Sequence, residues 1–265
     1  MKTVMLLIHE DPGQEARLQC ALDVVRAVEG HLFCLNVIQM PVVADGFGAG
    51  GGAGLLLMDE REREDRNVER LDARLVKEGV SFEWARVHSH ADVTLTESAR
   101  LVDLLVMSKH GIGDLIESGD CAARLANQMT VPIMVVPSDQ RGLDLFGKAL
   151  VTWDGSGPAD AAVRAAAPLL RFASEVTVLT IIEGEEKADP ADVAAYLDRH
   201  GCTVSIRREP KSGAVPAQLL AALEESGASW CVMGAYGRGR LREQLFGGAS
   251  KTLLAKAGVP LLIAR

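Results

Sequence analysis

Short apolar runs alternate with longer amphipathic segments along most of the chain. Runs such as 4–8, 176–182 and 230–233 are mostly apolar and short enough to be buried strands. The segments between them, such as 161–172 and 217–225, carry apolar residues at helical spacing. Apolar strands that alternate with helices predict an α/β protein whose parallel sheet is covered by helices on both faces.

The same pattern occurs twice. The matching runs are 4–8 with 149–153, 31–38 with 175–182, and 131–136 with 259–264. Each copy predicts five strands that alternate with four helices, so we expect two similar open five-stranded parallel sheets. Residues 1–140 are called domain one and residues 147–265 domain two, and a linker of about residues 138–147 is expected between the two copies.

Domain one carries an insertion after its second strand. Glycines cluster there, and we expect residues 42–56 to form a mobile loop, followed by a charged helix over 58–78. The run DEREREDRNVER at 59–70 predicts a solvated helical face with ion pairs four residues apart.

Composition argues against several functions. The net charge is −8 and no basic stripe is present, so a nucleic acid is not an expected partner. No apolar run is long enough to span a bilayer, and the first run is too short for a signal peptide. The five cysteines form no CxxC pair, so Cys20, Cys34 and Cys231 are expected to be buried thiols in a reducing cytoplasm.

One glycine pattern in domain two has the setting of a phosphate site. Met233 and Gly234 end an apolar strand, Gly237 follows, and Gly247 comes just before a helix expected to begin near Ser250. Glycines let backbone approach a ligand closely, and a helix start offers unpaired N–H groups. Asp154 follows another strand, and the carboxyl ends of parallel strands share one edge of the sheet. We therefore expect this aspartate and the glycine segment to face one ligand.

These residues resemble the universal stress protein family, here as a tandem of two family domains. The motif of its ATP-binding branch, G-x2-G-x9-G-(S/T), matches Gly234, Gly237 and Gly247, and the family's aspartate after the first strand matches Asp154. The resemblance covers almost the whole chain and implies the adenine-nucleotide α-hydrolase-like fold. It also implies ATP as the cofactor, with Mg²⁺.

The resemblance implies a role for each matching residue. Asp154 is expected to contact the adenosine part, and Ile181 to pack beside the base. The expected nucleotide-binding residues are Asp154, Ile181, Met233, Gly234, Gly237, Arg238, Gly247, Gly248 and Ser250. Gly248 departs from the family's Ser/Thr, so one hydroxyl contact is missing unless Ser250 replaces it. The architectural alternative is that these glycines serve only a tight turn and close helix–strand packing.

Domain one departs further from the motif. His9 stands at the position of Asp154 and Ser108 at that of Gly234, so we predict that domain one does not bind ATP in the family manner. Its histidines at predicted strand ends are candidate metal ligands, and the alternative is that they are solvated. These candidates are His9, His88, His90 and His110.

The function that the sequence favours is a cytoplasmic stress-response protein in which domain two binds an adenine nucleotide as a sensing module. No catalytic residue is assigned, and at most weak hydrolysis of ATP is expected. The rival functions are a slow ATPase and a nucleotide-free scaffold, or a small-ligand or metal binder that uses domain one. Occupancy of the site is expected to alter contacts with protein partners that the sequence does not identify.

The resemblance also predicts how the two copies pair. Single-domain relatives commonly pair through their last strands, which here are 133–136 and 261–264. Pairing of these strands within one chain gives an intramolecular pseudo-dimer and covers two sheet edges. Whether two chains form a further homodimer stays open at this point.

Overall fold

The structure is a computed structural model that describes residues 1–38, 52–88, 91–109, 121–184, 188–235 and 248–265. The elements of domain one are β1 (Thr3–Ile8), α1 (Gln14–Val28), β2 (His31–Ile38), α2 (Gly52–Glu78), β3 (Ser81–His88), α3 (Ala91–Ser98), β4 (Leu104–Ser108), α4 (Cys121–Gln128) and β5 (Ile133–Val136). Those of domain two are β6 (Lys148–Thr152), α5 (Gly157–Leu170), β7 (Glu175–Ile182), α6 (Pro190–Arg199), β8 (Val204–Pro210), α7 (Val215–Ser226), β9 (Trp230–Gly234), α8 (Gly248–Lys256) and β10 (Leu261–Ala264).

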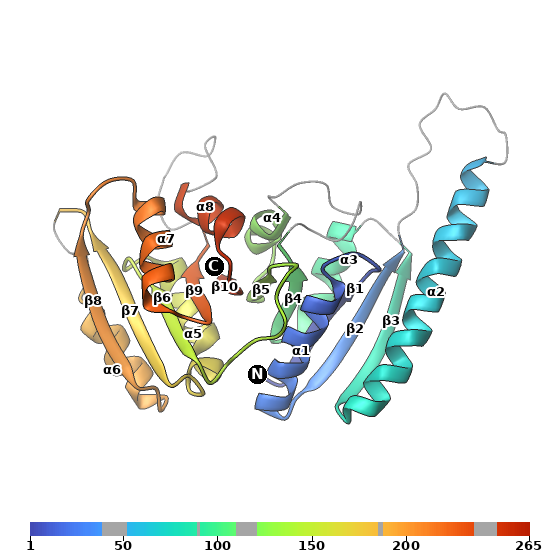
Figure 1. The fold of residues 1–265 in the computed structure, drawn as a ribbon, viewed down its shortest axis with the longest axis horizontal. Helices are drawn as coiled ribbons and strands as arrows, with labels where there is room; N and C mark the ends of the chain where they lie inside the picture. The colour runs from blue at the N-terminus through green and yellow to red at the C-terminus, as the bar shows by residue number, and fades with distance from the viewer. Residues whose placement is uncertain (39–51, 89–90, 110–120, 185–187, 236–247) are drawn as a thin grey trace.

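The ten strands form one continuous sheet in the order β3-β2-β1-β4-β5-β10-β9-β6-β7-β8 (Figure 1). Within each domain, neighbouring strands run parallel. The predicted α/β class, the two five-stranded halves and the order of strands and helices are confirmed. Strands buried on both faces explain the nearly continuous apolar runs.

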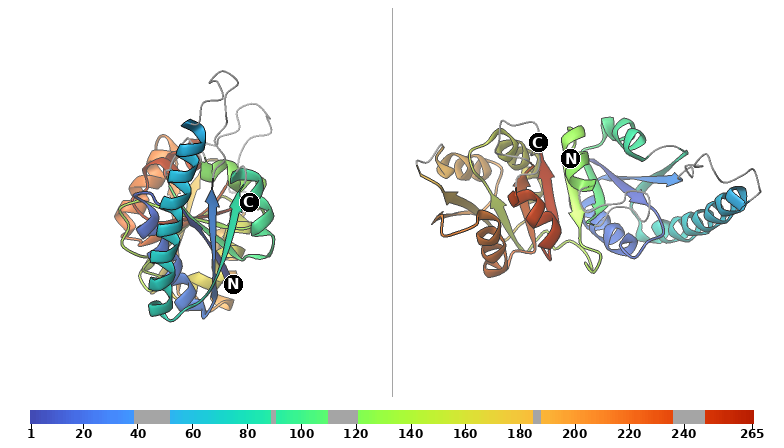
Figure 2. Two further views of the ribbon diagram at one scale, coloured as in Figure 1. Left: turned by 90° about the vertical axis from the view of Figure 1, so that its right-hand side faces the viewer. Right: turned by 90° about the horizontal axis from the view of Figure 1, so that it is seen from above.

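The two halves join where β5 and β10 pair antiparallel, and this pair is called the seam. Its register sets Leu261 opposite Val135 and Leu262 opposite Met134. Viewed from above, the seam lies at the centre with one domain on each side (Figure 2). The predicted intramolecular pairing of the last strands is therefore confirmed, and it covers one edge of each half-sheet.

Helices cover both faces of this sheet. Helices α1, α2, α5 and α6 contribute to one apolar cluster, and α3, α4, α7 and α8 to the other. Because the sheet twists, the face that carries α1 points toward the viewer in domain one, whereas the same face, with α5, points away in domain two (Figure 1).

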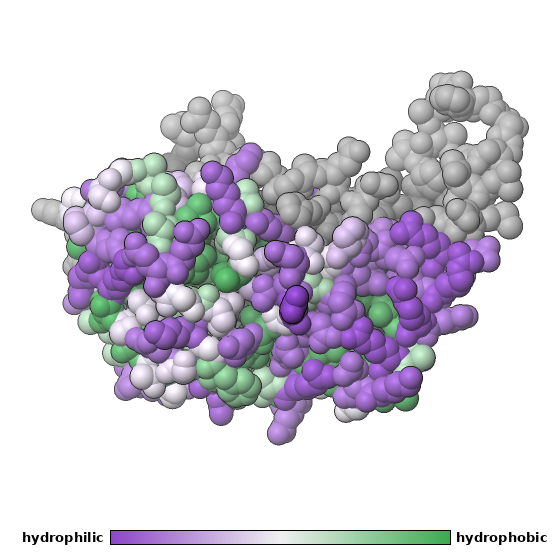
Figure 3. Space-filling model, in the orientation of Figure 1, coloured by the Kyte–Doolittle hydropathy of each residue, from purple (hydrophilic) through white to green (hydrophobic). Residues whose placement is uncertain are grey.

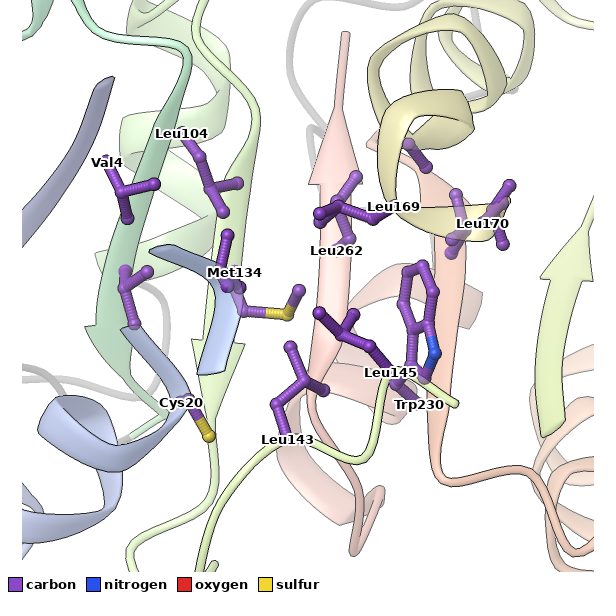
Figure 4. Close-up of a cluster of buried hydrophobic side chains, with 14 of the residues drawn as sticks. Val4, Cys20, Leu104, Met134, Leu143, Leu145, Leu169, Leu170, Trp230 and Leu262 are labelled. Atoms are coloured by element: carbon purple, nitrogen blue, oxygen red, sulfur yellow. The ribbon is translucent and has the colours of Figure 1, made fainter. Parts of the chain in front are cut away.

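The first apolar cluster is continuous across the seam. Met134 and Leu262 meet there, and Leu143 and Leu145 of the linker pack near Trp230 (Figure 4). Full burial of a leucine side chain contributes about 1.5–3 kcal/mol, so the linker is part of the core that joins the domains.

The starts of helices α5 and α2 depend on local sequence in different ways. Ser156 caps α5, since its Oγ accepts a hydrogen bond from the amide of Ala159 at 3.4 Å, as the Ser-Gly-Pro sequence indicates. The helix expected from residue 58 instead begins at Gly52, so the last part of the expected 42–56 loop is helical. A nucleated helix gains a backbone hydrogen bond with each added residue, which outweighs the cost of two glycines. Residues 39–51 lie outside the described part of the chain.

The charged run at 59–70 was expected to be a solvated face, and this expectation is wrong in one respect. Its described part carries exposed ion pairs, such as that between Arg66 and Glu62, and hydrophilic residues gather over domain one (Figure 3). Glu64 and Asn67, however, are only 1% and 2% exposed. The run therefore also supplies a buried polar contact to the end of β1.

Candidate functional site

A pocket of about 390 Å³ lies in domain two at the carboxyl ends of β6, β7 and β9. It is enclosed by the starts of α5 and α8 and by one face of α7. The volume is in the range of small-molecule sites, about 300–1,000 Å³. Its lining residues include Thr152, Trp153, Asp154, Ser156, Leu179, Ile181, Glu183, Lys211, Val215, Pro216, Leu219, Met233, Gly234, Ala249 and Ser250.

The structure brings five of the nine predicted site residues together around this pocket: Asp154, Ile181, Met233, Gly234 and Ser250. Gly248 begins α8, directly before two lining residues. The other three, Gly237, Arg238 and Gly247, lie outside the described residues. The expectation that Asp154 and the end of β9 share one edge of the sheet is met.

The turn after β6 holds Asp154. One carboxylate oxygen, Oδ1, accepts a hydrogen bond from the amide of Ser156 at 3.1 Å. Gly155 between them has a φ of 72°, in the left-handed region that glycine adopts readily. The turn thus sets a carboxylate at the mouth of the pocket, beside the start of α5.

The inner part of the pocket is apolar. Ile181 from β7 and Met233 from β9 are buried, and Leu219 of α7 closes the same side. Trp153 also lines the pocket, and its indole Nε1 donates to Oδ1 of Asp160 at 2.9 Å. That bond fixes the ring within the wall of the pocket.

The packing of the protein itself explains why position 234 is a glycine. A Cβ at this position would lie 2.5 Å from the amide nitrogen of Ala159 and 2.7 Å from the carbonyl carbon of Pro158. The end of β9 passes so close to the start of α5 that a side chain does not fit. Close helix–strand packing therefore requires this glycine, whatever ligand the pocket takes.

The start of α8 completes the described pocket. Ala249 and Ser250 line it, and the Ser250 hydroxyl donates to the carbonyl of Gly234 at 3.5 Å. The first N–H groups of a helix have no partner within the helix, and they carry partial positive charge. This end of the pocket therefore suits an anionic group.

Sequence reasoning missed an ion pair at the pocket. Lys211 follows β8 and Glu183 follows β7, and Nζ of the lysine lies 2.7 Å from Oε1 of the glutamate. Both residues line the pocket. Their positions after strand ends were the available signal, because the same reasoning selected Asp154.

The equivalent place in domain one is filled by a side chain of the protein itself. Arg17 of α1 is completely buried and donates five hydrogen bonds. Its guanidinium binds Asp11 through two 2.9 Å hydrogen bonds and also reaches the hydroxyl of Ser108. The carbonyls of Leu7 and His9 accept the other two bonds, at 3.2 and 3.0 Å.

This group, called the Arg17 cluster, consists of Arg17, Asp11, Ser108 and the two carbonyls. The strand matches align His9 with Asp154, Asp11 with Ser156, and Ser108 with Gly234. Those three positions of domain two line its pocket. An internal ion pair thus joins, in domain one, the positions that surround the pocket in domain two.

The close approach of strand and helix is also solved differently in domain one. Gly13 aligns with Pro158, and a Cβ on Gly13 would clash with the hydroxyl oxygen of Ser108. The glycine therefore stands on the helix side in domain one and on the strand side in domain two. Ser108 fits at the motif position because Gly13 leaves room for it.

His9, a candidate metal ligand, instead faces the buried Glu64 of α2. Its Nδ1 lies 2.8 Å from Oε1 of Glu64, whose Oε2 accepts from Asn36 at 2.9 Å. Burial alone would raise the pKa of the Glu64 carboxyl, but contacts with His9, the amide of Glu10 and Asn36 outweigh burial and lower the pKa to about 2. The network holds α2 against the ends of β1 and β2.

No group of three or more metal-binding side chains occurs within the described ranges. The side chain of His88, and His90 and His110 altogether, lie outside what the structure describes. Cys20, Cys34 and Cys231 are fully buried free thiols, as expected. Burial raises the pKa of Cys34 and of Cys231 to about 12. In the described part of the chain, no helix is long and apolar enough to cross a membrane.

Comparison with solved structures first gives the class of protein, an α/β protein with two similar halves. A universal stress protein from Archaeoglobus fulgidus DSM 4304 matches 99% of this chain and 96% of its own, with 19% identity and a TM-score of 0.77. A functionally unknown protein from Pseudomonas aeruginosa PAO1 matches 99% of this chain and 92% of its own, with 16% identity and a TM-score of 0.59. At these identities the likeness shows the fold alone. No curated protein matches the chain.

The profile of the universal stress protein family matches residues 1–137 and again residues 146–265. These two matches cover nearly the whole chain. The chain therefore belongs to the universal stress protein family and carries the family's domain twice.

Proposed function

We propose that domain two binds an adenine nucleotide, with ATP as the first expected ligand, and that the protein acts as a nucleotide-sensing module in a stress response. The observation that carries the proposal is the pocket in which Asp154, Ile181, Met233, Gly234 and Ser250 meet. Residues chosen for a nucleotide from sequence alone thus surround one cavity of suitable volume.

The pocket has the chemistry that the three parts of a nucleotide need. Its apolar inner part, around Ile181 and Met233, suits a flat base. The carboxylate of Asp154 suits the hydroxyl groups of a ribose, and the start of α8 suits phosphate. When bound, Mg²⁺ would neutralise charge on the phosphates, and it commonly keeps water and phosphate oxygens as ligands. Ser250, which lines the pocket at the start of α8, supplies a hydroxyl oxygen at the phosphate end.

The proposal describes binding with at most slow hydrolysis, and a location in the cytoplasm. Among the described pocket residues, Asp154 is a candidate general base, but its Oδ1 accepts the amide of Ser156 and the family resemblance gives it a binding role. The unpaired thiols of Cys20, Cys34, Cys202 and Cys231 support a reducing compartment.

The experiment is titration calorimetry with ATP·Mg²⁺, adenosine and GTP·Mg²⁺ on the wild-type chain and on two variants. Asp154→Ala should weaken ATP by about 10- to 100-fold, because a hydrogen bond to a charged group is worth about 1.5–3 kcal/mol. The control Asp192→Ala removes an exposed carboxylate from the first turn of α6 and should leave the affinity unchanged.

Each rival function has its own outcome. Absence of binding at millimolar ATP·Mg²⁺ would overturn the proposal in favour of a scaffold or a small apolar ligand, for which the architectural role of Gly234 already leaves room. Sustained release of phosphate that disappears in Asp154→Ala would favour the slow ATPase.

A further inference from the structure

Helices α4 and α8 lie side by side above the seam, and the carboxyl end of each is held by the other domain (Figure 1). Lys109 of domain one donates from Nζ to the carbonyl of Ala257, just past the end of α8, at 3.0 Å. Arg265 of domain two donates from Nη1 to the carbonyl of Asn127, in the last turn of α4, also at 3.0 Å. The two domains thus cap each other's last helix.

Such a contact has a clear energetic role. The last carbonyls of a helix have no partner within the helix and carry partial negative charge, so a cation near them is favourable. The amide of Ala257 still bonds to the carbonyl of Leu253 at 2.8 Å, so the lysine meets a regular helical turn. Lys109 is half-buried, which limits competition from water.

The opposite end of α8 is the end that lines the pocket. The helix has nine residues and is about 14 Å long, so one short run of backbone hydrogen bonds joins its two ends. Ala249 and Ser250 in its first turn face the pocket, while Leu253 and Leu254 are buried in the core. A change in how the carboxyl end is held therefore changes where the first-turn amides point.

The Lys109 contact has no counterpart at the aligned position of domain two. Lys109 aligns with Ala235, and their amides make equivalent bonds, Lys109 to the carbonyl of Val136 at 2.8 Å and Ala235 to that of Ala264 at 2.7 Å. The backbone at this position is therefore held alike in both domains, but of the two aligned residues only Lys109 has a side chain that can cross the seam. Domain two reaches α4 from a different position, Arg265.

We infer that Lys109 of domain one is a positioning residue for the phosphate end of the domain-two site. The inference rests on the proposed function. Domain one then has a task that does not depend on a ligand of its own: it fixes the helix whose N-terminal turn meets the phosphates.

The test compares Lys109→Met, which keeps most of the apolar stem, with the matched control Arg265→Met, which removes the cap of α4 instead. Lys109→Met should weaken ATP about two- to fivefold, in proportion to the energy of a helix-end cation, and leave adenosine unchanged. Lys109→Arg, which keeps a cationic donor, should restore ATP binding. Arg265→Met should bind both ligands as the wild type does.

A second measurement separates positioning from general stability. Hydrogen exchange of the ligand-free chain should show faster exchange in α8 for Lys109→Met and unchanged exchange in β6 and β7. Equal weakening of ATP and adenosine, or an ATP affinity equal to that of the wild type, would overturn the positioning role while the proposed function stands. A wild-type chain that binds neither ligand would overturn both.

Discussion

Domain one and domain two have the same arrangement at the carboxyl edge of the sheet, where strand ends meet a helix start and the backbones approach closely. In domain one this place holds a polar cluster, and in domain two it holds a pocket. In domain one the guanidinium of Arg17 bonds to Asp11 and Ser108. The residue of domain two that aligns with Arg17 is Ala162, which is small and buried. A short side chain at this helix position leaves the space near the strand ends unfilled.

The comparison teaches that loss of a ligand motif need not leave an empty site. Ser108 would be a defect at a motif glycine, but here it accepts a hydrogen bond, and Gly13 across from it makes the room. The residues that replace the motif in domain one therefore satisfy one another's hydrogen bonds within the core. Experiments on the two domains can test each half of this comparison.

The largest effect is expected from Arg17→Met. The substitution leaves the Asp11 carboxylate without its buried partner, and breaking such a pair costs about 3–5 kcal/mol. Urea unfolding should show this loss in the free energy of unfolding. The control Arg164→Met, at an exposed position of α5, should change it by less than about 0.5 kcal/mol. A cost for Arg17→Met that equals the control would mean that the cluster does not stabilise domain one.

The second effect concerns Glu64 and pH. Its pKa of about 2 in the folded chain lies below its ordinary value, so its stabilisation is present above about pH 4.5 and is lost as the pH falls toward 2. The full contribution is about 3 kcal/mol by linkage. Unfolding measured at pH 6, 4 and 3 should show a steeper acid loss for the wild type than for Glu64→Gln.

Glu62→Gln is the matched control for this pH series, because Glu62 is an exposed carboxylate in the same helix. It should keep the acid slope of the wild type. If Glu64→Gln and Glu62→Gln showed the same slope, the buried contact with His9 would not be the source of the pH dependence.

A smaller effect is expected from adding a side chain where β9 approaches α5 in domain two. Gly234→Ser forces a Cβ against the backbone of α5 and should cost about 1–3 kcal/mol, as overpacked substitutions do. The control Gly157→Ser adds a Cβ at an exposed glycine of α5, where it meets nothing within 4 Å, and should change the free energy of unfolding by less than about 0.5 kcal/mol. Thermal unfolding measures both variants. Equal costs would show that the packing of β9 against α5 does not require Gly234.

Much of the fold follows from local sequence. Short apolar runs such as that of β9 predict buried strands between helices, and the repeated order of elements predicted both halves. The pairing of the two halves was predicted from the family resemblance. Asp154 could be predicted because the strand ends of a parallel sheet meet at one edge, whereas Ile181 was predicted from the family resemblance. The turn chemistry of Ser156 was equally local.

Other features depend on contacts between distant segments. Arg17 reads as an ordinary helix residue until β4 brings Ser108 to it, 91 positions away in the chain. Glu64 lies in a run of charges, and only the docking of α2 on β1 and β2 distinguishes it from its exposed neighbours. The contact of Lys109 with Ala257 joins residues that are 148 positions apart in the sequence, one in each domain, and no local pattern predicts it.

The antiparallel joint of β5 with β10 has a consequence for mass action. A pair of separate single-domain chains dissociates on dilution, whereas two halves on one chain keep each other at an effective concentration on the order of millimolar. The ten-stranded sheet therefore forms at any protein concentration in the cell. The two domains can also diverge in sequence from each other, because they are not identical copies of one chain.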